Sequence, residues 1–125
     1  MSAFTVTAVK SVNVGGPGAQ KRAIIQCTGT ASYDTGGSVL NLASTNTTLT
    51  GLNNEAAFTY VHGVSVVNVD TAASDKYRLQ YLGAAAFAPA TGVIKCRDLS
   101  AASDAEVSST TDLSATTWTF EVFGV

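Results

Sequence analysis

Apolar and polar residues alternate in short runs along most of this chain, and stripes of helical period are scarce. Alternation places every second side chain on the same face of an extended strand. Two runs show this most clearly. Their apolar faces would carry Tyr77, Leu79 and Tyr81 in the first run and Trp118, Phe120 and Val122 in the second. The pattern predicts an all-β protein.

Turn-forming residues divide the chain into about six to eight predicted strands at hairpin-like spacing. The clearest predicted segments are residues 4–14, 21–32, 38–42, 58–69, 76–81, 93–99 and 116–125. Because no long helices are available as crossovers between parallel strands, we expect a single antiparallel domain. A β-sandwich or jelly-roll-like fold suits this arrangement, and a compact barrel is the alternative.

Details of the pattern lead to further expectations about single segments. Residues 58–69 are rich in valine and apolar on both faces in places, which is typical of a central strand covered on both sides. They suit an antiparallel hairpin with residues 76–81. Residues 41–54 are polar and predict a surface loop. Residues 100–106 fit one helical turn, since Ser100 is a permitted N-cap.

The N-terminal segment is set apart by a cluster of breakers, Gly15-Gly16-Pro17-Gly18. We therefore divide the chain into an N-terminal arm with its hinge, residues 1–18, and a β domain, residues 19–125. Such an arm could add a strand to a neighbouring molecule. The alternative is that this segment is the first strand of its own sheet.

Composition narrows the range of partners. The chain has 125 residues, of which 46% are hydrophobic and 13% charged, and its net charge is -2. No basic cluster exceeds the pair Lys21-Arg22, so direct contact with nucleic acid is not expected. The N-terminus lacks a basic segment followed by an apolar one, and no run of about 18 apolar residues occurs. We expect a protein made in a cytosol without a membrane anchor.

Cys27 and Cys96 both fall on the apolar faces of their predicted strands. They are either two buried thiols or the two halves of a disulfide, and folding in a cytosol favours thiols. There is no C-x-x-C motif and no cluster of ligands, so neither a metal nor another cofactor is expected.

Candidate catalytic chemistry is sparse. His62 is the only histidine and thus the only imidazole base, and it lies in a predicted strand without a nucleophile elbow. A structural or surface role suits it better than catalysis, so we expect no enzyme. Sugar binding would need exposed rings, for which Phe123 and one of Tyr60 or Tyr81 are candidates.

Three phrases of the sequence resemble small structural proteins of tailed-bacteriophage virions, and capsid decoration (cement) proteins most of all. The phrases are CTGTASYDTGG at 27–37, KYRLQY at 76–81 and TDLSATTWTFEVFGV at 111–125. The resemblance spans residues 21–125. It implies a β-rich domain on the outer surface of the phage head, assembled in the bacterial host cytoplasm. It further implies that the domain bridges neighbouring major capsid protein subunits, often as a homo-oligomer and frequently as a trimer, with no catalytic residues.

On this interpretation the arm supplies the first candidate contacts with the capsid, and the loop 41–54 supplies the second. The arm residues are Phe4, Val6, Val9 and Val12. The alternative function is a carbohydrate- or receptor-binding module of a head fibre or tail. A small hydrolase built around His62 is the third hypothesis.

Overall fold

The computed structural model describes residues 3–15, 20–69, 77–99 and 105–125. The elements in this part of the chain are β1 (Thr5–Val14), β2 (Lys21–Thr28), β3 (Ser38–Val39), α1 (Thr47–Leu52), the 3₁₀ turn η1 (Asn54–Ala56), β4 (Val61–Val69), β5 (Tyr77–Leu82), the 3₁₀ turn η2 (Ala85–Phe87), β6 (Val93–Asp98) and β7 (Thr117–Gly124).

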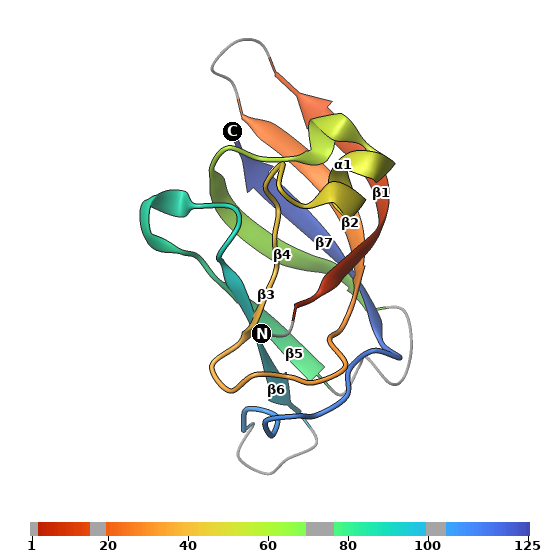
Figure 1. The fold of residues 1–125 in the computed structure, drawn as a ribbon, viewed down its shortest axis with the longest axis vertical. Coiled ribbons are helices and arrows are strands. Elements are labelled where there is room, and N and C mark those ends of the chain that lie inside the picture. Colours follow the sequence, from red (N-terminus) through yellow and green to blue (C-terminus); the bar gives the residue numbers. More distant parts are fainter. Residues whose placement is uncertain (1–2, 16–19, 70–76, 100–104) are drawn as a thin grey trace.

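The strands form two antiparallel sheets. One sheet has four strands in the order β1-β2-β7-β4, and the other has three in the order β3-β6-β5. Figure 1 shows the two sheets in separate layers, with α1 beside β1. The prediction of an all-β, sandwich-like single domain is confirmed.

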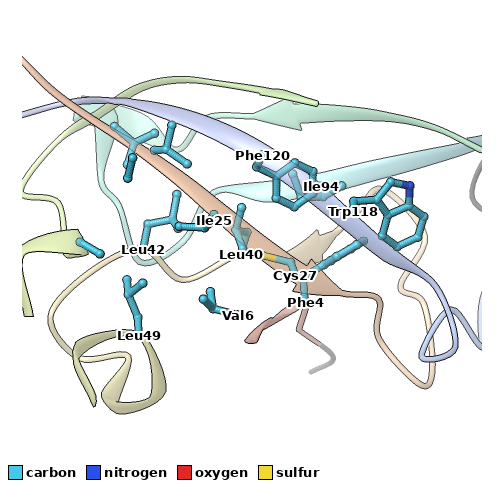
Figure 2. Close-up of a cluster of buried hydrophobic side chains, with 14 of the residues drawn as sticks. Phe4, Val6, Ile25, Cys27, Leu40, Leu42, Leu49, Ile94, Trp118 and Phe120 are labelled. Carbon is cyan, nitrogen blue, oxygen red and sulfur yellow. The ribbon is translucent and has the colours of Figure 1, made fainter. Parts of the chain in front are cut away.

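The core lies between the sheets and is centred on β7. Trp118 and Phe120 are fully buried, and they stand opposite Cys27 and Ile25 of β2. Ile94 reaches the same cluster from the three-stranded sheet, as Figure 2 shows. Burying a large apolar side chain stabilises the folded state by about 1.5–3 kcal/mol. The alternation of residues 116–125 therefore predicted correctly which face of this strand is buried.

The position of the valine-rich strand differs from the prediction. β4 pairs with β7 alone and lies at an edge of the four-stranded sheet, where Val66 is 36% exposed. It forms no hairpin with β5, which belongs to the other sheet. A run of valines favours an extended backbone, but it does not specify which strand lies alongside. The connection at residues 70–76 lies outside the described part of the chain.

The segment 41–54 is more ordered than the predicted loop. It contains α1, whose N-cap Asn46 accepts a hydrogen bond from the Leu49 N–H at 3.2 Å. Leu49 is fully buried against the core. A helix of six residues is too short to leave a periodic signal in the sequence.

The N-terminal segment is not a free arm in this structure. Val6 pairs with Cys27, and the Phe4 N–H donates to the Val39 carbonyl at 2.8 Å. Phe4 and Val6 are 3% and 1% exposed. β1 is thus the first strand of the domain's own sheet, which is the alternative that the sequence left open. The hinge residues 16–19 lie outside the described part.

The predicted helical turn at 100–106 lies mostly outside the described residues. Its last two residues are extended beside β6, where the Asp98 N–H donates to the Ala105 carbonyl at 2.8 Å. Glu106 pairs with Arg97 in an antiparallel bridge. This segment covers the edge of β6 that β3 leaves open.

A loop-to-loop ladder closes the end of the sandwich next to β7. The Gly29 N–H donates to the Thr116 carbonyl at 3.0 Å, and the Leu113 N–H donates to the Thr30 carbonyl at 2.8 Å. A Cβ atom at Gly29 would overlap the Cβ and carbonyl oxygen of Leu113. The two backbones can approach this closely only because residue 29 has no side chain.

The burial of Phe4 leads to a test of how the N-terminal strand contributes to stability. Its ring packs against Trp118, with the centroids 5.8 Å apart. We expect Phe4→Ala to lower the free energy of unfolding by about 3–5 kcal/mol in urea denaturation. Val14→Ala, at the last residue of β1, which is 53% exposed, should change it by less than about 0.5 kcal/mol. Equal effects would show that the segment does not belong to the core.

The close approach at Gly29 leads to a second test, with a matched control in α1. We expect Gly29→Ala to lower the melting temperature markedly, because the new methyl group must displace the backbone at Leu113. At Gly51 of α1 a Cβ meets nothing within 4 Å. There the same substitution should stabilise the protein by about 0.5–1 kcal/mol, because alanine favours helix more than glycine does. Calorimetry of both variants measures these changes. An unchanged melting temperature for Gly29→Ala would contradict the close backbone approach between Gly29 and Leu113.

Candidate interaction surfaces

The four predicted arm contacts differ in how deeply the structure buries them. Phe4 and Val6 lie in the core, and Val9 and Val12 are half-buried and pack against it. The open edge of β1 carries exposed Lys10 and two register shifts. Charged residues and bulges on an edge strand disfavour the addition of a further strand. In this conformation Phe4 and Val6 are thus inaccessible, whereas Val9 and Val12 keep part of their side chains at the surface.

The second predicted contact region, residues 41–54, borders a surface hollow of about 310 Å³. The residues that line it are Ala3, Phe4, Thr5, Val6, Asn41, Thr45, Asn46, Thr47 and Thr48. The amide group of Asn46 donates to the Asn41 carbonyl at 2.7 Å, and the Asn41 side chain accepts from the Ala43 N–H at 2.9 Å. These two asparagines hold the walls of the hollow in place.

His62 is exposed on β4 and contacts an aromatic ring instead of a catalytic partner in the described structure. Its ring lies edge-on to Phe87, with the centroids 5.3 Å apart. Phe87 is 58% exposed and has a φ of 58°, and Ala86 before it has a φ of 57°. Two adjacent non-glycine residues in the left-handed region raise the energy of the backbone. The η2 turn therefore exposes Phe87 in a strained conformation.

Of the rings proposed for sugar binding, Tyr60 is 48% exposed, whereas Phe123 is half-buried and Tyr81 turns inward. The sequence analysis missed Phe87. In the sequence Phe87 is a single large residue in a run of alanines, and this pattern does not indicate whether its ring is exposed.

Both cysteines are buried, as the alternation of their strands predicted, and both are free thiols. Burial, together with the carboxylates of Asp98 and Glu106, raises the pKa of Cys96 to about 12. Burial alone raises the pKa of Cys27 well above its usual value. At neutral pH both groups are thiols, which are poor nucleophiles and poor metal ligands.

No group of three or more His, Cys, Asp or Glu side chains with the geometry of a metal site occurs within residues 3–15, 20–69, 77–99 and 105–125. In the same ranges no helix has the length and apolar character needed to cross a membrane.

Glu106 connects two segments that lie far apart in the sequence. Its Oε2 atom accepts hydrogen bonds from the Tyr33 hydroxyl and from the Gly36 N–H, both at 2.6 Å. The Tyr33 oxygen in turn accepts from the Cys96 N–H at 3.0 Å. One carboxylate therefore joins the 33–36 turn to the segment beside β6. The sequence analysis gave this residue no role.

The electrostatics of Glu106 follow from these contacts. Burial acts to raise the pKa of its carboxyl group, but the hydrogen bonds from Tyr33 and Gly36 and the nearby charges of Lys95 and Arg97 outweigh burial and hold that pKa below its usual value. Burial and the hydrogen bond to Glu106 raise the pKa of Tyr33. The pair is therefore a tyrosine donor and an ionised carboxylate at neutral pH.

The outer face of the three-stranded sheet brings together basic residues that are separate in the sequence. Arg78 of β5 lies directly opposite Arg97 of β6, and Gln80 lies opposite Lys95. These residues are separated in the chain, where the pair Lys21-Arg22 was the largest basic cluster. The pairing of β5 with β6 creates this face, and the sequence analysis did not predict it.

Comparisons of the chain with protein-family models, with curated proteins and with solved structures gave no match.

The Glu106 site leads to a pH-dependent prediction. Because the pKa of Glu106 is lower in the folded state, its contribution to stability is complete above the unfolded pKa of about 4.3. That contribution is lost as the pH falls through the folded value. We expect Glu106→Gln to lower the free energy of unfolding at pH 7 by about 1–2 kcal/mol, because two hydrogen bonds to a charged oxygen are weakened.

The difference between Glu106→Gln and the original protein should shrink as the pH falls below about 4. Glu55→Gln, at an exposed residue of η1, is the matched control and should leave the stability curve unchanged. Urea denaturation across the pH range measures both. A difference for Glu106→Gln that stays constant with pH would contradict an electrostatic role.

Proposed function

We propose that this chain is a structural protein of a tailed-phage virion that decorates the outer surface of the capsid. In this role it would bind neighbouring major capsid protein subunits and strengthen the contacts between them. The homo-oligomer, with a trimer as the frequent form, and the location on the virion surface belong to the same proposal. It assigns no catalytic residue, cofactor, nucleic acid or membrane contact.

The main support is the place in the fold of the phrases that resemble decoration proteins. The phrases 27–37 and 111–125 lie side by side in the ladder that closes the sandwich, where Tyr33 exchanges backbone hydrogen bonds with Thr110 and Thr111. The phrase 76–81 overlaps β5, an edge strand of the second sheet. The resemblance therefore falls on segments that build the domain together.

The outward side of the four-stranded sheet also suits a protein that functions by contact. Thr28 lies opposite Thr117 on the face turned away from the core, and both side chains are half-buried there. Such a paired sheet holds its outward side chains in fixed positions, and repeated binding across a shell would use fixed contacts of this kind.

The second candidate is a carbohydrate- or receptor-binding module of a head fibre or tail. The observation that favours it is the exposed pair of Phe87 and His62, displayed on a turn with two left-handed residues. Aromatic faces held in fixed positions are suited to stacking on a ligand ring.

Copy number separates the two functions. Quantitative mass spectrometry of purified particles of the phage that encodes the chain would compare its peptides with those of the major capsid protein. We expect a number of copies that scales with the capsid subunits. A handful of copies per particle would favour the fibre or tail module, and absence from the particles would overturn both.

A further inference from the structure

Four apolar side chains lie on the outer face of the four-stranded sheet, near the end of β7. Phe123 and Val125 occupy outward positions, because the even-numbered positions of β7 are buried. Tyr60 and Val125 exchange both backbone hydrogen bonds, at 2.9 and 3.0 Å, so their side chains lie on the same side of the sheet. Ile24 of β2 stands opposite Glu121, which also points outward. We call Ile24, Tyr60, Phe123 and Val125 the outer patch.

The outer patch is apolar at positions where a strand surface facing water usually carries polar residues. Tyr60 is 48% exposed and Val125 is 37% exposed, and the other two members are half-buried. Farther along the same face the outward positions are polar, with Thr28 opposite Thr117. An apolar area bordered by polar residues is typical of a contact site.

Gly63 holds the ring of Phe123 in a fixed position within the outer patch. Gly63 of β4 stands opposite Phe123, and a Cβ atom added at residue 63 would lie 2.5 Å from the Cζ atom of the ring. The ring therefore lies against the glycine backbone, which it can approach only because residue 63 has no side chain. Glycine weakens the interior of a strand and often marks such a close approach. A ring that is fixed before binding loses little conformational entropy on contact with a partner.

A pair of opposite charges borders the outer patch. The Arg22 Nε atom lies 4.0 Å from the Glu121 Oε1 atom, and the two side chains are 63% and 30% exposed. Arg22 stands opposite Phe123 on the same outer face. A two-fold axis through this face presents Arg22 of one copy to Glu121 of the other, and the reverse contact is identical. The face is therefore complementary in charge to a second copy of itself.

We propose that the outer patch is the interface of a two-fold homodimer, in which Arg22 of each copy pairs with Glu121 of the other. Aromatic residues and arginine are enriched in protein interfaces, and homodimer interfaces are more apolar than others. Tyr60, Phe123 and Arg22 supply these residue types on one face. The inference rests on the proposed function only for the homo-oligomer, which it specifies as a dimer.

Sedimentation velocity of the full-length protein over a range of concentrations tests the interface. We expect a reversible dimer. Tyr60→Ser and Val125→Asp should each raise its Kd by at least about tenfold, because the two-fold axis places every change in the interface twice. Leu52→Ser is the matched control, since Leu52 is 47% exposed on α1, whose Leu49 packs into the core. The control should leave the Kd unchanged, and thermal melting of each variant shows that it is folded.

An exchange of charges separates contacts between copies from contacts within one copy. Arg22→Glu and Glu121→Arg should each weaken the dimer by at least about tenfold, because like charges then meet across the interface. An equimolar mixture of the two variants should dimerise again, since each copy meets the opposite charge on its partner. The repulsion inside each copy persists in the mixture, so this recovery measures the contact between copies. A mixture that associates no better than either variant would overturn the proposed pairing.

Other results would also overturn the proposal. They are a protein that stays monomeric up to about 1 mM, a trimer, or a dimer whose Kd is the same in Tyr60→Ser and Val125→Asp. A monomer that binds capsids and loses this binding in Tyr60→Ser would assign the outer patch to a capsid subunit instead of a second copy.

The virion experiment fails or succeeds separately. A protein that dimerises through the outer patch but is missing from particles would refute the proposed function and leave the interface intact. A protein that is abundant in particles but does not dimerise through this face would refute the interface alone.

Discussion

The fold depends on the burial of one side of β7. This strand is paired on both edges, with β2 and with β4, and its inward side chains Trp118, Phe120 and Val122 are fully buried. Trp118 contacts the ring of Phe4, which directly precedes β1, and the ring of Tyr77 from the second sheet. A single indole thereby joins the N-terminal strand, the central strand and the opposite layer. Aromatic contacts of this kind add to the free energy that comes from burial of apolar area.

Hydrogen bonds between loops stabilise the end of the sandwich next to the core. The loops next to β7 are held by backbone hydrogen bonds between residues 29–33 and 110–116, and Glu106 adds a charged acceptor for Tyr33 and Gly36. A buried tyrosine hydroxyl without a partner would destabilise the protein, so the carboxylate stabilises the core although it lies near the surface. In a chain with few charged residues, one glutamate thus has a structural role that its neighbours in sequence do not suggest.

The outer faces of the two sheets carry different side chains. The outward face of the four-stranded sheet mixes Thr28 and Thr117 with Arg22 and Glu121, whereas the other sheet collects Arg78, Lys95 and Arg97. The strand that the sequence suggested as a free arm is committed to the core, because Phe4 and Val6 stabilise the domain only when they are buried. The outer faces of the sheets, the η2 turn and the hollow beside α1 are among the exposed features of the described residues.

The sequence by itself determined the class of the fold and the inward face of most strands, because the period of two is a property of each extended segment alone. In residues 77–81 and 117–124 the alternation alone indicated which side chains face the core. Only the tertiary structure decided that β4 lies at an edge, that the N-terminal strand stays in its own sheet and that Arg78 faces Arg97. Those outcomes depend on which strands become neighbours. Pairing is selected by the packing of the whole core, and the local pattern of a strand does not encode it.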